Sequence, residues 1–490
     1  MKYKKIMLIN PSNSVAKSSV RRIAPPLGIL YLGSSLEQNG YAVDIIDSPC
    51  EGYYNILKKS EYIVYGLKDK QIKRRVEYFD PDFIGISSMF SSSQPRALHH
   101  ADLVKEVSNA PVVMGGIHPS IEPVETLKHK SVDFVIEGEG EQRLLKLLNM
   151  LNKGEKDFNF DGISYKKKGK IIYNPRKTRI QNLDLIPFPN RNLVNFEKYV
   201  DIGVPFAPFP KGKRPCQILT SRGCPFHCVF CSTVNHWGRT FRKRSVDNIM
   251  KEIHYMIDKY KVDEIQFADD NMTIDKQRAF ELFERYRDEV KLPWCTPHGL
   301  MIKTLDKKMI KVMAESGAYQ VTIAIESGSR RVLKEIIHKP VPPKEVVKEF
   351  VDLFHKYGVQ VHGLFVVGFP GEKKKEIIKT LEYPFDVGFE SVTYFTANPM
   401  PGSELYDICK EKGYLKENGY KDFKAAEIII PKKSSDYFMS PIELTKLVEK
   451  YTEKYNRWSM KHFPEQWKNK FKVFLEKHPE QKEKLLGRVT

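Results

Sequence analysis

One short stretch constrains this chain more than any other: the segment Ser221–Ser232, which holds three cysteines in a C-x3-C-x2-C spacing. Cys224, Cys228 and Cys231 are three of only seven cysteines in 490 residues. Short loops of this kind hold iron–sulfur clusters, because a loop can wrap several thiolates around one cluster. Three thiolates leave one iron of a four-iron cluster free to bind a small molecule. The spacing therefore predicts a metal-binding loop that follows a strand at Gln217–Thr220.

Two other uses of these cysteines compete with a cluster. Zinc accepts three cysteines together with a fourth Cys or His at short spacing, and His227 or His236 could in principle supply it. A disulfide is disfavoured in a chain that we expect to remain in the reducing cytoplasm. The spacing favours an iron–sulfur cluster over zinc. The remaining cysteines are too scattered for a second cluster and are interpreted as structural thiols: Cys50, Cys216, Cys295 and Cys409.

Composition describes an ordinary globular protein. With 490 residues, 41% of them hydrophobic, the chain is long enough for two or three domains. It has no run of about 18 apolar residues, so we expect no membrane span. The opening residues Met1–Pro11 predict a β-strand and not a signal peptide, which favours the cytoplasm. The net charge of +19 could suit an acidic partner, but its lysines are scattered, so nucleic acid is disfavoured and the charge is assigned to solvated faces.

The first 148 residues alternate between strands and helices. Strands are expected at Lys5–Asn10, Tyr41–Ile46, Phe83–Ser88, Pro111–Met114 and Asp133–Ile136, and helices at Pro26–Asn39 and His99–Ser108. This alternation predicts a parallel, doubly wound sheet, whose ligand site lies beyond the carboxyl ends of the strands. Polar and glycine-rich pieces stand at those ends: Asn10, Ser87-Ser88, Gly115-Gly116-Ile117-His118 and Glu137-Gly138-Glu139. Glycines there let the backbone approach a ligand, although tight turns would explain a Gly-Gly pair as well.

The segment 149–210 is interpreted as a linker with a hairpin at Asp161–Tyr173. From 211 to 410 the chain repeats strand and helix again, which predicts a full or partial β/α barrel. Its strands are expected at Glu264–Phe267, Thr296–Gly299, Gln320–Ile325, Val359–Val367 and Ser391–Thr396, and its helices at Lys276–Val290, Lys307–Ser316 and Pro343–Tyr357, with another helix capped by Ser245.

Acidic and hydroxyl side chains follow two of the barrel strands. Asp269 and Asp270 could bind an ammonium group, and Glu326 with Ser327 could bind ribose hydroxyls. As alternatives, the acidic pair could cap a helix, and Glu326 could pair with a nearby basic residue, Arg330 or Lys334. The last region, 411–490, is expected to be helical and to pack on the barrel through Leu444, Leu447, Tyr451 and Tyr455.

Together these patterns resemble the cobalamin-binding radical S-adenosylmethionine (SAM) enzymes. The cysteine loop, with the aromatic Phe230 before its last cysteine, resembles the loop that binds the cluster and SAM in radical SAM proteins. The helix start at Pro25–Gly28, followed by Ser-Ser, Gly-Gly-x-His-Pro and Gly-Glu-Gly-Glu, resembles the cobalamin-binding domain that precedes many of them. The resemblance implies a doubly wound, Rossmann-like cobalamin-binding domain at 1–148, a linker at 149–210, a radical SAM partial (β/α)6 barrel at 211–410 and a helical region at 411–490.

The resemblance also assigns residues to three cofactors. A [4Fe–4S] cluster is expected on Cys224, Cys228 and Cys231, and SAM at Phe230, Asp269, Asp270, Glu326 and Ser327. Cobalamin is expected at Asn10, Ser87, Ser88, Gly115, Gly116, His118, Glu137, Gly138 and Glu139. The chain lacks an Asp-x-His-x-x-Gly motif, so cobalamin is expected to bind without a histidine ligand from that motif. Candidates near its lower face are not ranked: Lys17, Arg21, Arg22 and Met89.

The implied activity is that of a cobalamin-dependent radical SAM C-methyltransferase. SAM is cleaved to a 5′-deoxyadenosyl radical, which takes hydrogen from an unactivated carbon, and methylcobalamin supplies the methyl group. A cobalamin-dependent radical SAM cyclase or ring-rearranging enzyme without methyl transfer shares these motifs and stays an alternative. An electron donor such as flavodoxin or ferredoxin is the expected partner, and the substrate is left open among small molecules, peptides and proteins.

Two further readings are disfavoured. An RNA methylthiotransferase would need a second cluster on three N-terminal cysteines, and only Cys50 precedes residue 216. A cofactor-binding sensor without turnover would not need the intact cysteine loop and the acidic pair that follows it.

Overall fold

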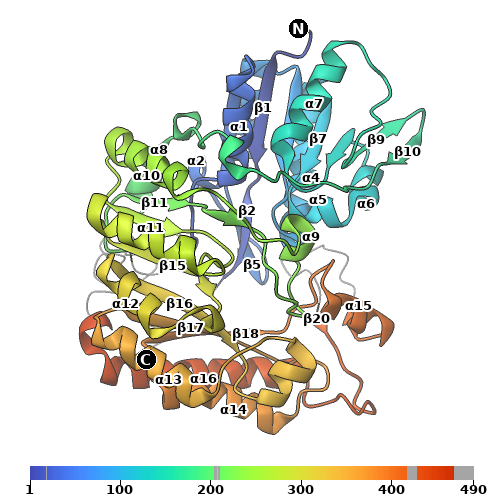
Figure 1. Cartoon of the computed structure of the whole chain (residues 1–490). Coiled ribbons are helices and arrows are strands. Elements are labelled where there is room, and N and C mark those ends of the chain that lie inside the picture. Colours follow the sequence, from blue (N-terminus) through green and yellow to red (C-terminus); the bar gives the residue numbers. More distant parts are fainter. Residues whose placement is uncertain (18, 204–206, 208–209, 417–426, 468–490) are drawn as a thin grey trace.

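A computed structural model describes residues 1–17, 19–203, 207, 210–416 and 427–467. Figure 1 shows two α/β domains, with the first (blue to teal) above the second (green to orange). The first is built on a seven-stranded sheet in the order β10-β9-β8-β7-β6-β1-β3. Its parallel strands are β1 (Lys5–Asn10), β3 (Ala42–Asp47), β6 (Phe83–Ser87), β7 (Val112–Gly115) and β8 (Phe134–Ile136). The five predicted strands are confirmed to within a residue at each end.

Helices cover both faces of this sheet, as the doubly wound prediction requires. On one face α1 (Leu27–Gln38) and α7 (Gly140–Asn152) share a core with strand residues such as Ile6 and Leu8. On the other face α3 (Asp69–Phe79) and α4 (Gln94–Val107) pack on Met7 and Ile9. Sequence reasoning missed α3, and it placed the start of α4 five residues late. Pro95, in the first turn of α4, marks the true start.

The segment between the domains begins by extending the first sheet. The predicted hairpin forms as β9 (Ile163–Lys167) and β10 (Lys170–Tyr173), and β9 pairs antiparallel with β8. A small antiparallel sheet that the sequence did not indicate lies beside the domain, formed by β2 (Asn13–Ala16), β4 (Ile56–Lys58) and β5 (Tyr62–Tyr65). Its strands have three or four residues each, too few for a periodic pattern.

The second domain has six parallel strands in the order β11-β14-β15-β16-β17-β18, with β11 and β18 at the two edges. Their bounds are Pro215–Ile218, Glu264–Phe267, Trp294–Leu300, Ala318–Glu326, Gln360–Val367 and Ser391–Thr396. The outer helices are α10 (Val246–Tyr260), α11 (Lys276–Glu289), α12 (Lys307–Glu315), α13 (Lys344–Lys356) and α14 (Lys374–Val387). The side chain of Ser245 caps α10 as predicted, and the prediction of a partial barrel is confirmed.

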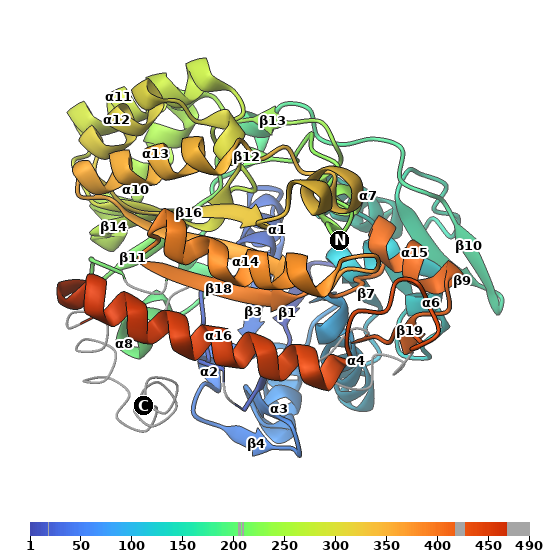
Figure 2. The same ribbon diagram turned by 90° about the horizontal axis from the view of Figure 1, so that it is seen from below.

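The C-terminal region contains a long helix, α16 (Pro441–His462), which runs beside α14 and β18 (Figure 2). Leu444 and Tyr455 are buried in the core of the barrel, and Leu447 and Tyr451 pack against it, as predicted. Helix α15 (Glu404–Glu411) and a short pair, β19 (Leu415–Lys416) with β20 (Glu427–Ile428), precede α16. The predicted helical structure at 417–426 and 468–490 lies outside the described residues. Of the helices that the structure describes, none is both long and apolar enough to span a membrane.

Candidate active site

The cysteine loop follows β11 and a two-residue strand, β12 (Ser221–Arg222), that pairs with β13 (Arg242–Lys243). Gly223 has a positive φ of 91°, and a Cβ there would collide with the carbonyl oxygen of Thr240, so the tight turn into the loop requires glycine. Within the loop, Val229 donates to the carbonyl of Ile337 at 3.0 Å and accepts from the amide of Leu405 at 2.8 Å. The loop is thereby anchored to segments that follow β16 and β18.

The three cysteines are half-buried free thiols in one electrostatic neighbourhood. Burial raises the pKa of Cys224 to about 11, and Asp270 acts in the same direction. Burial also raises the pKa of Cys228 to about 11, where the cation of Lys339 opposes it and the carboxylate of Glu326 adds to it. Residues that follow two of the barrel strands, β14 and β16, therefore lie near the thiols.

The acidic pair after β14 divides into two roles. Asp269 is buried and accepts hydrogen bonds from the backbone and hydroxyl of Thr220, at 3.1 and 2.8 Å, and from Ser221. It thus fastens the approach to the cysteine loop. Asp270 stays accessible, although the surrounding protein and Asp269 raise its pKa to about 6. Neither residue caps α11, because Asp275 does so. Asp270 accepts a hydrogen bond from the backbone of Gly223 and is the exposed member of the pair, where an ammonium group could reach it.

Glu326 ends β16 in a left-handed conformation with φ of 68°. Its carboxylate pairs with Lys339 at 2.7 Å, and the two side chains are 7% and 5% exposed. The basic partner of Glu326 is therefore Lys339, which was not predicted from the sequence, and not Arg330 or Lys334. Ser327 is fully buried and bonds the hydroxyl of Thr380 at 3.0 Å, so its side chain serves the packing of α14. Phe230 packs beside Phe369, with 6.0 Å between ring centroids.

The carboxyl edge of the first sheet presents backbone groups and polar side chains. Gly116 has a positive φ of 106°, and a Cβ there would lie 2.5 Å from the carbonyl oxygen of Ser88. His118 is buried against the hydroxyl of Ser91 at 3.0 Å, and burial lowers its pKa to about 4. Gly115 and the half-buried Ser87 end the neighbouring strands β7 and β6. Asn10 donates to Asp47 at 2.7 Å.

This edge faces the cysteine loop of the second domain. Helix α5 (Ile117–Ile121), which follows β7, contacts α9 (Thr233–Trp237), which follows the loop. Asn235 of α9 in turn donates to the carbonyl of Gly402, beyond β18. Cofactors bound at the two edges would therefore lie between the domains and near one another.

Two family models match this chain in the same order as the two domains. Residues 13–148 match the B12 binding domain, and residues 218–383 match the radical SAM superfamily. The chain is 37% identical to cytidylyl-2-hydroxyethylphosphonate methyltransferase of Streptomyces wedmorensis over 84% of this chain and 83% of that one. It is 32% identical to an uncharacterized methyltransferase of Pyrococcus horikoshii, over 92% of both chains. The chain belongs to the cobalamin-binding radical SAM methyltransferases.

Other similarities agree with this assignment. The fold resembles the radical SAM methyltransferase TsrM of Kitasatospora setae, with a TM-score of 0.67 over 85% of this chain and 78% of that one, at 15% identity. An anaerobic magnesium-protoporphyrin IX monomethyl ester cyclase of Rubrivivax gelatinosus is only 24% identical, over 83% of this chain and 70% of that one. The cyclase alternative is therefore the more distant one, and the enzyme uses a [4Fe–4S] cluster, SAM and cobalamin.

The residues present fit these cofactors. The structure's described residues contain no group of three His, Cys, Asp or Glu side chains that could hold a single metal ion. A four-iron cluster differs from such a site, because each thiolate binds a different iron and the sulfurs do not converge on one point. At the cobalamin edge, Ser88 Oγ and Glu137 Oε1 are buried without a partner among the described residues, as expected where a polar ligand binds.

Glu139 is the predicted cobalamin residue whose environment differs most from the expectation. Its carboxylate binds Arg222 Nη1 at 2.9 Å and Arg242 Nη1 at 2.7 Å, and it also accepts from the backbone of Ile180. Burial alone would raise the pKa of Glu139, but the two guanidinium groups hold it below its usual value. The neighbouring Gly138 has a positive φ of 68° and donates to Ser120. Both glutamates of the Gly-Glu-Gly-Glu motif, Glu139 and Glu141, thus contact Arg222 of the second domain.

Proposed function

We propose that this methyltransferase acts on a saturated carbon of a small phosphonate that is carried as a cytidylyl conjugate. The observation that carries the proposal is the 37% identity, over 84% of this chain, to a methyltransferase whose name gives cytidylyl-2-hydroxyethylphosphonate.

When bound, the cluster and SAM supply a 5′-deoxyadenosyl radical, and cobalamin supplies the methyl group. The part of this chain is to hold these groups and one C–H bond in line and to keep water away from them. For the substrate, the barrel offers two accessible side chains near the carboxyl ends of its strands, His298 on β15 and Phe395 on β18. Burial lowers the pKa of His298, and the nearby carboxylate of Asp269 opposes that shift.

The proposal includes the source of electrons. For each product, one C–H bond becomes C–CH3, and the hydrogen leaves in 5′-deoxyadenosine together with free methionine. A second SAM gives its methyl group by way of cobalamin and leaves as S-adenosylhomocysteine. Two electrons are consumed, and we assign them to a flavodoxin or ferredoxin in the cytoplasm.

The substrate is tested with anaerobically reconstituted protein that holds both cofactors, supplied with SAM, a reductant and cytidylyl-2-hydroxyethylphosphonate. We expect a product heavier by one methylene unit, with one 5′-deoxyadenosine and one S-adenosylhomocysteine per product. Free 2-hydroxyethylphosphonate tests whether the cytidylyl group is needed. An inert conjugate, with SAM cleavage intact, would reject this substrate, whereas a product without the added methylene unit would return the cyclase or ring-rearranging alternative.

A further inference from the structure

Two arginines and two glutamates form a buried cluster where the first domain meets the cysteine loop. Arg222 binds Glu139 through Nη1 at 2.9 Å and Glu141 through Nη2 at 2.7 Å, and Arg242 binds Glu139 at 2.7 Å. The four side chains are 1% to 8% exposed. The glutamates stand at the start of α7, and the arginines stand on the paired strands β12 and β13.

The cluster is directional as well as ionic. The guanidinium group of Arg222 uses two nitrogens on two different carboxylates, which sets its plane as well as its position. It also lies over the rings of Trp237 and Tyr31, at 4.7 and 5.3 Å from their centroids. Arg242 donates further to the carbonyls of Ile180 at 2.6 Å and Trp237 at 3.0 Å.

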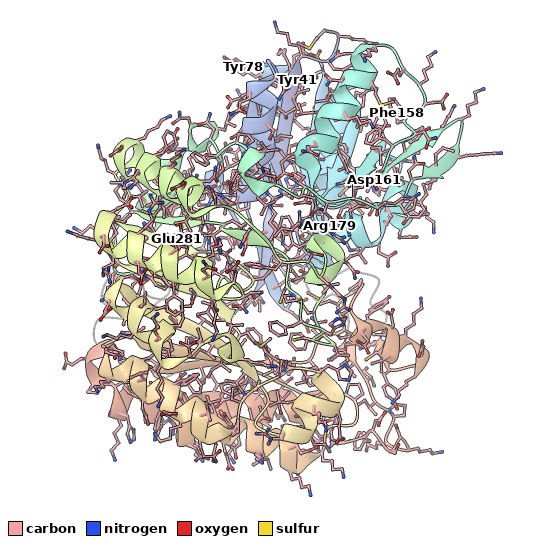
Figure 3. All side chains as sticks on the ribbon, in the orientation of Figure 1. Tyr41, Tyr78, Phe158, Asp161, Arg179 and Glu281 are labelled. Atoms are coloured by element: carbon pink, nitrogen blue, oxygen red, sulfur yellow. The ribbon has the colours of Figure 1, made fainter. Side chains whose placement is uncertain are left out.

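These contacts join five parts of the chain around one point. They include α1 and α7 of the first domain, the segment after Arg179 that passes between the domains (Figure 3), β12 with β13, and α9. Arg222 is two residues before Cys224, and the turn at Gly223 between them is tight. A displacement of Arg222 is therefore passed directly to the first cluster ligand.

Stability alone does not account for such a cluster. Well-packed apolar residues of similar volume often replace buried ion pairs without loss of stability, because burying charge carries a large desolvation penalty. Charged groups that make several directed hydrogen bonds instead allow the two surfaces that carry them to dock in only one relative position. Here those surfaces are the cobalamin domain and the loop that holds the iron–sulfur cluster.

We propose that Arg222, Arg242, Glu139 and Glu141 are positioning residues that fix the cysteine loop, and with it the cluster and SAM, against the cobalamin-binding domain. The same SAM site must present its methyl group toward cobalamin and its 5′ carbon toward the substrate, so an error of about 1 Å costs much of the rate. The inference rests on the cofactors of the family and not on the proposed phosphonate substrate.

The test uses Glu139→Gln in the full-length protein loaded with iron–sulfur cluster and cobalamin. The reduced cluster and cob(II)alamin are both paramagnetic, so the magnetic dipolar coupling between them reports their separation by electron paramagnetic resonance. We expect the variant to keep both cofactors, with a dipolar coupling that is shifted or spread over a range. With SAM and a chemical reductant alone, S-adenosylhomocysteine formation should fall roughly tenfold relative to 5′-deoxyadenosine formation.

The matched control is Asp161→Asn. Asp161, labelled in Figure 3, pairs at 2.6 Å with Arg143, which lies on α7 as Glu141 does. This pair does not reach the cysteine loop. The substitution should leave the coupling and the product ratio unchanged. Should Glu139→Gln fail to fold, Glu141→Gln removes a single contact to Arg222 and gives a milder version of the same test.

The outcomes are distinguishable. A changed coupling with both cofactors retained supports a positioning role. In a second series of variants, Arg222→Lys should then give a coupling between those of the wild type and Arg222→Met. An unchanged coupling and product ratio in both glutamate variants overturns it. Loss of both cofactors together from Glu141→Gln also overturns it, because that result means that the four charged side chains serve only the stability of the fold.

Discussion

The two domains meet their cofactors with the same edge of a parallel sheet but with different chemistry. The barrel gathers ionisable side chains around the thiols: Asp270 follows β14, and Glu326 and Lys339 belong to the end of β16 and the connection after it. The first domain offers backbone at Gly116, and its buried His118 is uncharged at neutral pH. We propose that the first of these edges binds metal and the charged ends of SAM, and that the second lets a large, flat cofactor approach the main chain.

The largest effect that separates the two edges is removal of the thiolates. Cys224→Ala/Cys228→Ala/Cys231→Ala should lose about four irons per chain and all SAM cleavage. It should retain cobalamin, since no thiolate contributes to the first domain. Iron, sulfide and cobalamin quantification on anaerobically purified protein checks this. Cys409→Ala, a buried cysteine of α15, should keep its iron. Zinc in place of iron in the wild type would contradict the mechanism.

The reciprocal change is Gly116→Ala. A methyl group there meets the carbonyl of Ser88 at 2.5 Å and forces a side chain into φ of 106°, a strain of about 1–3 kcal/mol. We expect cobalamin to fall well below one per chain while iron stays near the wild-type value. Gly28→Ala serves as the control, because it lies in α1 with nothing within 4 Å of the added carbon. Loss of iron from Gly116→Ala would show that the two edges are not independent.

A third change sharpens the contrast inside the barrel. Lys339→Met leaves Glu326 buried without its partner, which should destabilise the protein by about 3–5 kcal/mol. Lys344 pairs with Asp386 at the same 2.7 Å, but both side chains are about half exposed, so Lys344→Met should cost less than about 1 kcal/mol. Urea unfolding of both variants compares them. Equal effects would remove the case for a special environment at Glu326.

Some residues at the two sheet edges could be predicted from the sequence and others could not, for physical reasons. Cys224, Cys228 and Cys231 could be predicted as metal ligands from the sequence, because metal ligation requires one residue type at a fixed spacing. The strand Lys5–Asn10 was predicted exactly, because burial on both faces leaves a continuous apolar run at Ile6–Ile9. Lys339 carries no such signal: a lone lysine gains its meaning only when the fold brings it to Glu326.

The same reasoning explains the cobalamin edge. The Gly-Glu-Gly-Glu motif indicated that backbone and carboxylates matter there, but not which way each carboxylate turns. Glu137 Oε1 is buried without a partner among the described residues, whereas the carboxylate of Glu139 forms ion pairs with Arg222 and Arg242. These partners lie 83 and 103 residues away along the chain. Contacts of that range depend on how two domains dock, and no local pattern records them.

The smallest expected effect is a pH dependence in the first domain. Asp47 ends β3, and burial raises its pKa to about 7, although the hydrogen bond from Asn10 opposes that rise. An unfolded Asp titrates near 3.9, so between about pH 4 and 7 the folded chain binds more protons at this site than the unfolded chain. Stability from Asp47 is therefore full below about pH 4 and is lost as pH rises toward 7, by less than about 1.4 kcal/mol per pH unit.

Asp47→Asn isolates this contribution, because the amide keeps the shape of the side chain and cannot ionise. We expect the difference in unfolding free energy between wild type and variant to vary across pH 4–7 and to be flat above pH 8. Urea unfolding at constant ionic strength measures it. A difference that does not vary with pH would mean that Asp47 remains charged throughout, held so by Asn10 and by the hydroxyl of Tyr199. In that case the edge beside Asn10 would be charged at neutral pH, and the contrast between the two edges would be weaker than the structure implies.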